Sequence, residues 1–148
     1  MYDIVFAENV TIESLNPHNF AMKNEYIDNL ISTAMLIVPK IACEHSGIRV
    51  LRGFLSNAYI RDNFKTDIAD YVLKHSMGLA IEITWDSFDL DEATSVGLSL
   101  IEQVIEPLFV LIDPAKRKLC IYRKYLKNNS CLSQVIGGKL RTVKSIEV

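Results

Sequence analysis

Cysteines are scarce in this sequence, and their spacing argues against two classes of protein. Cys43, Cys120 and Cys131 show neither the close spacing of a zinc knuckle nor the dense pairing of a disulfide-stabilised secreted domain. The odd number favours reduced thiols in a protein made in a cytoplasm. No segment joins a charged start to an apolar run, so the sequence predicts no secretory signal peptide. No apolar run approaches the roughly 18 residues that a membrane span needs.

An excess of charge of one sign is also missing. The chain has 16 basic and 18 acidic residues and a net charge of −2, which gives no bulk attraction to nucleic acid. Internal repeats, linkers and low-complexity tracts are lacking as well. With 148 residues, 49% of them hydrophobic, the chain can form one globular domain with its own core. We therefore expect neither nucleic acid nor a membrane among its partners.

The most informative stretch is residues 74–85, which reads KHSMGLAIEITW. Large apolar residues alternate with smaller or polar ones, the period of a half-buried strand. One face carries Glu82 beside the small Ala80, and the other carries Leu79, Ile81, Ile83 and Trp85. His75 precedes Glu82 by seven residues, and Gly78 lies between them and lets the chain turn. The two side chains can therefore meet on one metal ion; the alternative is a structural histidine before a core strand.

Two segments have the apolar spacing of helices that pack on a core. In residues 23–44 the apolar stripe consists of Tyr26, Ile27, Leu30, Ile31, Ala34, Met35, Val38, Ile41 and Ala42. Pro39 inside this segment predicts a bend or a break. The second helix is expected between a cap at Asp89 or Asp91 and a stop at Pro107.

The remaining segments indicate strands and loops. Residues 48–54 are a strand candidate, and residues 108–112 and 119–122 form a predicted hairpin around an Asp-Pro turn. The polar residues 57–73 are expected to form an irregular loop. Residues 135–148 are either an extension or terminal strand used in assembly, or a solvated tail.

The pattern H-x-x-G-x-A-x-[D/E], formed by His75, Gly78, Ala80 and Glu82, resembles the core motif of the zinc D-Ala-D-Ala carboxypeptidases and related phage endolysins. Further similar positions are Asn29, Leu30, Gly53, Phe54 and Ser56. The resemblance covers residues 10–125 and implies the hedgehog/DD-peptidase fold of that family. This fold is α+β, with a small, mostly antiparallel sheet and helices packed on one face. It also implies that His75 and Glu82 occupy the first two zinc-ligand positions, of which the second is normally Asp.

Two other parts of the family site are altered in this sequence. An arginine that helps to hold substrate in the family is replaced by Leu55, next to the retained Ser56, so a permanently charged carboxylate binder is lost. The nearest counterpart of the family's catalytic acid is Glu106, which precedes Pro107. Glu106 is either a general base or, as we prefer, a solvent-facing residue at a helix end.

The third zinc ligand of the family, a histidine, has no counterpart in this chain. Leu111 stands at the aligned position, and no histidine follows residue 75, since the two others are His18 and His45. Cys120 and Asp113 offer substitute ligands only from shifted positions. Because a catalytic zinc needs three protein ligands and an open position, we expect no bound zinc and no other cofactor.

These losses favour abandoned chemistry over a variant of it. We expect residues 1–126 to form a degenerate peptidase-like domain, and residues 127–148 a C-terminal extension or terminal strand. Because phages use this fold widely, we expect a pseudoenzyme that is a structural component of a bacteriophage virion, in the tail, baseplate or head, made in the host cytoplasm. Its expected partners are other virion proteins or copies of itself. The alternative is a zinc-dependent murein peptidase with atypical ligands, in which His75 and Glu82 bind Zn and Glu106 is the base.

Overall fold

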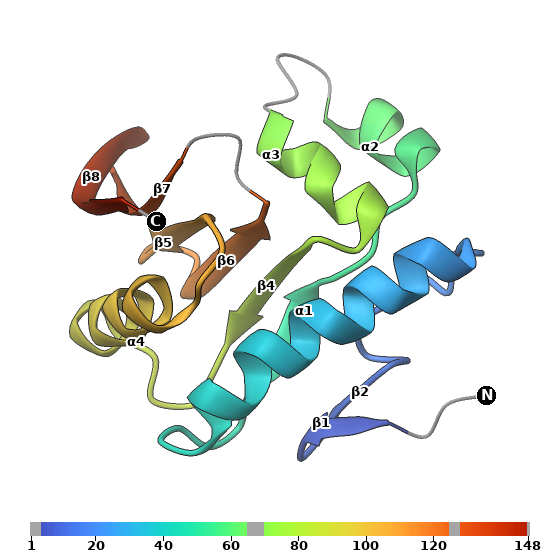
Figure 1. Ribbon diagram of the computed structural model, residues 1–148, viewed down its shortest axis with the longest axis horizontal. Helices are drawn as coiled ribbons and strands as arrows, with labels where there is room; N and C mark the ends of the chain where they lie inside the picture. Colours follow the sequence, from blue (N-terminus) through green and yellow to red (C-terminus); the bar gives the residue numbers. More distant parts are fainter. Residues whose placement is uncertain (1–3, 65–69, 125–127, 148) are drawn as a thin grey trace.

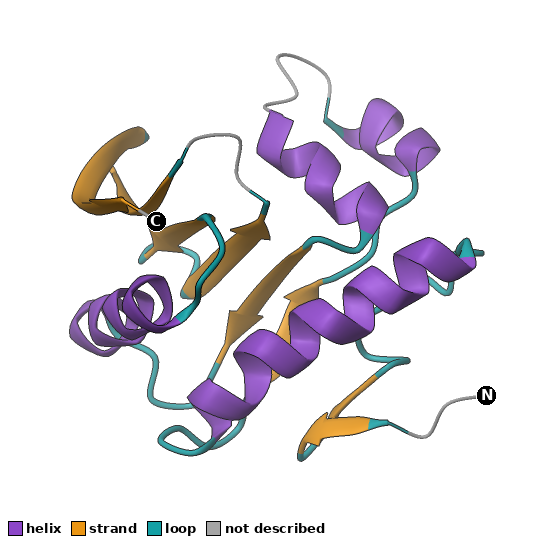
Figure 2. Cartoon of the chain, viewed as in Figure 1, coloured by secondary structure: helices purple, strands orange, loops and turns teal. Residues whose placement is uncertain are grey.

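A sheet of six strands forms the centre of the molecule in the computed structural model, which describes residues 4–64, 70–124 and 128–147 (Figures 1 and 2). The strands are β3 Arg49–Arg52, β4 Ala80–Thr84, β5 Leu108–Asp113, β6 Lys118–Arg123, β7 Asn129–Ile136 and β8 Lys139–Glu147. Their order is β3-β4-β6-β5-β7-β8, and neighbours are antiparallel except for the parallel pair β5 and β7. The predicted hairpin, β5 followed by β6, is confirmed.

Two long helices, α1 Asn24–Ala42 and α4 Leu90–Gln103, lie across one face of this sheet (Figure 1). The short helices α2 Asn57–Asn63 and α3 Asp70–Leu73 lie at one end of it. A separate small sheet, β1 Val5–Ala7 and β2 Val10–Thr11, lies beside α1. The expected α+β class with a mostly antiparallel sheet is therefore confirmed.

The main core lies between α1, α4 and the sheet. The apolar stripe of α1 buries Leu30, Ala34, Ile37, Val38 and Ile41, which pack in one cluster with Ile81, Ile83 and Trp85 of the β4 segment. The predicted burial of Leu79, Ile81, Ile83 and Trp85 is confirmed, with exposed fractions of 4%, 0%, 0% and 0%. The expectation that β4 is only half-buried is wrong, because its other face is covered as well.

Pro39 lies inside α1 but does not divide it, so the predicted break is not found. A proline removes one amide donor, which leaves the carbonyl four residues earlier, that of Met35, without its helical partner. Both positions are on the exposed side of the helix, where water can bind that carbonyl. The helix therefore continues to Ala42.

The start of α4 is set by Asp89, one of the two predicted capping residues. Its Oδ1 accepts a hydrogen bond of 2.8 Å from the backbone amide of Glu92, in the manner of an N-cap. The helix ends at Gln103, four residues before Pro107. Gly97 faces the sheet so closely that a Cβ there would lie 2.6 Å from Leu132 of β7.

The prediction of an irregular loop over residues 57–73 is wrong, because α2 and α3 lie within it. Ser56 caps α2 by accepting a 3.1 Å hydrogen bond from the Tyr59 amide, and Ile60 is its single buried residue. A helix of two turns with one buried position has too few apolar residues to show a helical period in the sequence. Residues 65–69 of this segment lie outside the described residues.

The C-terminal residues continue the sheet. β7 lies beside β5, and a two-residue turn of Gly137 and Gly138, both with positive φ, returns the chain into β8. Leu132 of β7 is fully buried in the main core. Of the two alternatives for residues 135–148, the described part, residues 135–147, therefore matches the terminal strand, although residues 139–145 are exposed to solvent.

Candidate functional site

The structure brings His75 and Glu82 together, as the sequence predicted. His75 lies in a 3₁₀ turn, η1 Lys74–Met77, that follows α3, and Gly78 with φ of +73° turns the chain into β4. A Cβ on Gly78 would clash with the Tyr26 carbonyl oxygen, so α1 also packs too closely here for a side chain. The side chains of His75 and Glu82 are buried, with residue exposures of 1% and 3%. His75 Nε2 lies 3.3 Å from Glu82 Oε2, an ion-pair distance without hydrogen-bond geometry.

The imidazole of His75 is fixed on its other side. Its Nδ1 lies 2.7 Å from the carbonyl oxygen of Gly53, and because a carbonyl only accepts, Nδ1 carries the proton. The backbone of His75 also accepts a hydrogen bond from the Leu55 amide, and the Tyr122 ring meets the imidazole edge-on at 5.7 Å. These contacts aim Nε2 at the carboxylate of Glu82.

The carboxylate of Glu82 is held by two cations from the neighbouring strands. Lys118 Nζ of β6 lies 2.6 Å from Oε1, and an Arg52 guanidinium nitrogen of β3 lies 3.2 Å from Oε2. The guanidinium of Arg52 also lies 5.1 Å from the centre of the Phe64 ring. Sequence reasoning missed Arg52 and Lys118 as partners, because the order β3-β4-β6 that places them beside Glu82 has no local signal.

These contacts decide the charge of the buried carboxyl group. Burial raises the pKa of Glu82, but the close contacts with His75 and Lys118 outweigh it and lower the pKa to about 2. Glu82 is therefore ionised at neutral pH and is satisfied by side chains of this chain.

The remaining positions do not complete a zinc site. Cys120 stands directly opposite Glu82 on β6, and Leu111 stands opposite Cys120 on β5, so all three share one face of the sheet. Burial, followed by the charge of Glu82, raises the pKa of Cys120 to about 12, so its sulfur is a thiol and not the thiolate that binds metal. Asp113 lies at the end of β5, opposite Lys118. Among the residues described, no three His, Cys, Asp or Glu side chains gather closely enough to hold a metal ion.

The other two histidines lie elsewhere. His18 stacks on Phe20 with ring centres 5.1 Å apart, and His45 contacts Glu92 at 2.9 Å and stacks on Trp85. The residues that the structure describes therefore supply the zinc positions His75 and Glu82 but not a third ligand. Such a set does not fit the three-ligand catalytic zinc of the resembled family.

Leu55 and Ser56 stand at the positions that bind substrate in the resembled family. In this chain their contacts are with the rest of the fold. Leu55 is 1% exposed and packs in the interior, and Ser56 caps α2. A buried leucine offers no charge with which to bind a substrate carboxylate.

Glu106, which we preferred to interpret as solvent-facing, is only partly so, because its side chain is 29% exposed and forms an ion pair. Two nitrogens of the Arg123 guanidinium bind its carboxylate, with the closest contact at 2.8 Å, and another binds Thr33 of α1 at 3.0 Å. Arg123 is an odd number of residues from Cys120 on β6 and therefore points to the helix-covered face, opposite to Glu82. Glu106 thus joins β6 to the helical layer and does not face the His75–Glu82 pair.

Comparison with family models, with curated proteins and with solved structures found no match to this chain. Among the described helices, none is long and apolar enough to cross a bilayer. The function of the site is therefore inferred from its own residues and from the resemblance of its motif.

Proposed function

We propose that this chain is a pseudoenzyme with a hedgehog/DD-peptidase-like fold, reused as a structural component of a phage virion. The observation that carries the proposal is the state of Glu82. Lys118 and Arg52 occupy both of its oxygens, at the position where the resembled family binds zinc. Two cations beside a carboxylate neutralise it and repel a divalent ion, and Leu111 offers no lone pair on the same face.

The ion pairs have a structural use that would explain why the motif is kept after the loss of zinc binding that we propose. Glu82 ties together β3 through Arg52 and β6 through Lys118, and it contacts η1 through His75. In the resembled family a zinc ion would instead join η1, β4 and β5, through the positions of His75, Glu82 and Leu111. We infer that internal charges have replaced the metal as the link, so that the domain is kept for assembly with other virion proteins or with its own copies.

Metal content tests the loss of zinc directly. Elemental analysis of protein dialysed after incubation with zinc is expected to show far less than one zinc per chain, and His75→Ala is expected to leave that result unchanged. The matched control is His18→Ala, because His18 is exposed and stacked at the surface. About one zinc per chain that is lost in His75→Ala but kept in His18→Ala would overturn the proposal.

The virion role has its own test. Quantitative mass spectrometry of purified particles is expected to find this chain in a fixed stoichiometry to the other virion proteins. Its absence from mature particles, while it is abundant in infected cells, would contradict a structural role.

One observation favours a second candidate, a zinc-dependent murein peptidase. The proton of His75 Nδ1 binds the Gly53 carbonyl and Nε2 faces Glu82, and metal-binding histidines are commonly oriented in this way. A third ligand would have to come from a rearranged group such as Cys120. Metal-dependent release of cell-wall peptides that disappears in Glu82→Ala would establish this candidate.

A further inference from the structure

The last strand of the sheet has a free edge. β8 runs from Lys139 to Glu147, pairs with β7 on one side and is the end of the strand order in the part of the chain that the structure describes (Figure 1). At nine residues it is the longest strand of the sheet. Such an edge presents unpaired amide and carbonyl groups that another strand can bind.

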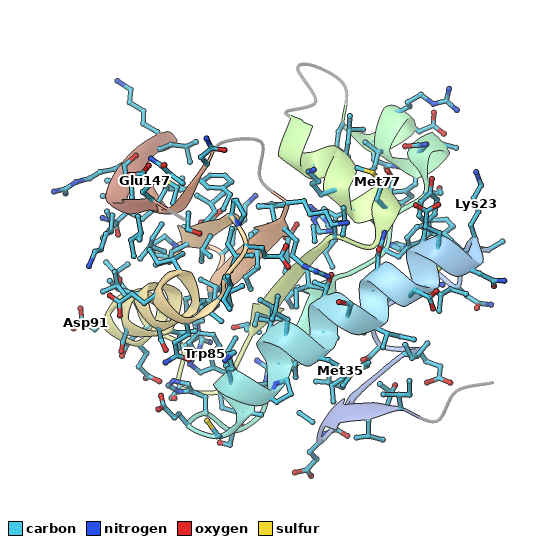
Figure 3. The ribbon with its side chains drawn as sticks, in the orientation of Figure 1. Lys23, Met35, Met77, Trp85, Asp91 and Glu147 are labelled. Atoms are coloured by element: carbon cyan, nitrogen blue, oxygen red, sulfur yellow. The ribbon has the colours of Figure 1, made fainter. Side chains whose placement is uncertain are left out.

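Both faces of β8 are also exposed. Every residue from 139 to 145 is exposed, and only Ile146 packs against the main core. Leu140 and Val143 are 56% and 40% exposed, and Ile136 at the end of β7 is 48% exposed. Side chains around the labelled Glu147 point outward from this hairpin (Figure 3). The edge therefore combines free backbone groups with exposed apolar side chains, as sites of strand addition do.

The charges along β8 indicate which strand fits this edge. Lys139 and Arg141 lie at its start and Glu147 at its end, whereas the charge of Lys144 is turned to Glu102 of α4 at 3.4 Å. Two copies of β8 side by side in antiparallel orientation bring the basic start of each strand to the acidic end of the other. Parallel pairing would instead place like charges together, which is unfavourable.

The register of the β7–β8 hairpin indicates where the two-fold axis of such an antiparallel pair lies. Leu132 faces Lys144 and Ser133 faces Thr142, so Val143 is an extra residue that makes a bulge near the middle of β8. A bulge bends its strand. Two bent strands fit each other in antiparallel orientation if the bends coincide, which places a two-fold axis near Val143.

We propose that two copies of this chain pair through β8 in antiparallel orientation, about a two-fold axis near Val143, so that their sheets become continuous. Such an interface is isologous, since the same strand serves in both copies. This pairing is the surface through which copies of the chain assemble, and its use in a virion rests on the proposed function.

A charge-exchange experiment tests the pairing. Wild-type protein is expected to dimerise in analytical ultracentrifugation, and Glu147→Lys or the double variant Lys139→Glu, Arg141→Glu to dimerise at least about tenfold more weakly. An equimolar mixture of the two variants is expected to recover dimers that contain one copy of each. The control Glu8→Lys reverses an exposed acid away from β8 and should leave the dimer unchanged. A monomeric wild type, or a mixture that stays monomeric, would overturn the proposal.

Cross-linking tests the position of the axis. In a Cys43→Ser background, Val143→Cys is expected to form a disulfide-linked dimer in the presence of oxidised glutathione, because the two introduced thiols lie beside the axis. Val5→Cys is the control, since Val5 is 66% exposed and lies in β1. Equal cross-linking rates for the two variants would overturn the proposed axis. Absence of the chain from particles would instead contradict only the virion role, so the two failures are distinguishable.

Discussion

The carboxylate of Glu82 shows how side chains of the same chain can stabilise a buried charge. Taking an ionised carboxyl group out of water costs several kcal/mol unless partners compensate for the lost hydration. Here Lys118 and Arg52 approach it while their own side chains remain 17% and 35% exposed, so these cations keep part of their hydration. The arrangement is therefore less costly than a fully buried ion pair, and it keeps Glu82 ionised.

The lowered pKa of Glu82 predicts a pH-dependent contribution to stability. Because the folded pKa of about 2 lies below the ordinary value of 4.5, the stabilisation is complete above about pH 5 and is lost as the pH falls towards 2. The stability difference between wild type and Glu82→Gln is expected to shrink by about 3 kcal/mol over this range. Urea unfolding at several pH values measures it.

The control for this experiment is Glu102→Gln, because Glu102 is 52% exposed and its ion pair, within the described residues, is with the exposed Lys144. Surface pairs of this kind contribute little, so this variant should follow the wild type at every pH. A stability difference for Glu82→Gln that stays constant from pH 5 to pH 2 would contradict the assignment.

The sequence could predict the His75–Glu82 pair because both residues lie within one local turn-and-strand segment. It could not predict Arg52 or Lys118 at the site, since these residues are 30 and 36 positions from Glu82. Nor could it predict that Glu106 binds Arg123, because that pair depends on how the loop after α4 lies against β6. The sequence therefore predicted the local pair of His75 and Glu82, but not that cations from neighbouring strands neutralise Glu82.

Among the elements, β4 is buried along its whole length, and Trp85, which directly follows it, tests how much this packing contributes to stability. The indole is fully buried, stacks on His45 at 4.9 Å, packs on Phe88 at 4.7 Å and donates from Nε1 to Glu92 at 3.3 Å. Trp85→Ala is expected to lower the free energy of unfolding by about 3–5 kcal/mol in denaturant titrations. Leu51→Ala, at a position that is 46% exposed, should cost much less. A near-neutral effect of Trp85→Ala would mean that the strand is not central.

The turn between η1 and β4 depends on Gly78 for two reasons that a matched pair of variants can separate. Gly78 has a positive φ and lies against the α1 backbone, whereas Gly138 has a similar φ of +77° but nothing within 4 Å of the place that a Cβ would take. Gly138→Ala is expected to cost about 1–2 kcal/mol for its backbone conformation alone. Gly78→Ala should cost clearly more, because α1 must also move. Equal melting temperatures for the two variants would contradict the close packing of α1 on this turn.

The long elements were predictable because each has a strong period of its own. α1 has a wide apolar stripe, and β4 and the β5–β6 hairpin have strand-like alternation or turn residues. α2 was missed because only Ile60 of its seven residues is buried. The continuation of α1 past Pro39 was missed because it depends on the exposure of that side of the helix, which a sequence pattern does not contain.

At the scale of the whole molecule, the C-terminal hairpin extends the sheet by two strands, β7 and β8. The sequence placed a boundary near residue 126, but β7 lies parallel to β5, which is central in the sheet, and buries Leu132 against α4. The sequence could not predict this pairing, because a parallel contact between strands separated by another strand has no local signature. The β7–β8 hairpin therefore packs in the same core as the helices and strands that precede it.

Two truncations distinguish the contributions of the last two strands. Removal of residues 127–148 exposes the β5 edge and leaves a cavity where Leu132 packs. The loss of one buried leucine alone lowers the free energy of unfolding by about 2–5 kcal/mol. We expect this truncated chain to lose cooperative thermal unfolding in calorimetry. Removal of residues 139–148 takes away β8, which is exposed except near Ile146, so β7 should stay in place and the protein should still unfold cooperatively at a lower temperature. An intact, cooperative domain of residues 1–126 would show instead that the boundary indicated by the sequence is a true one.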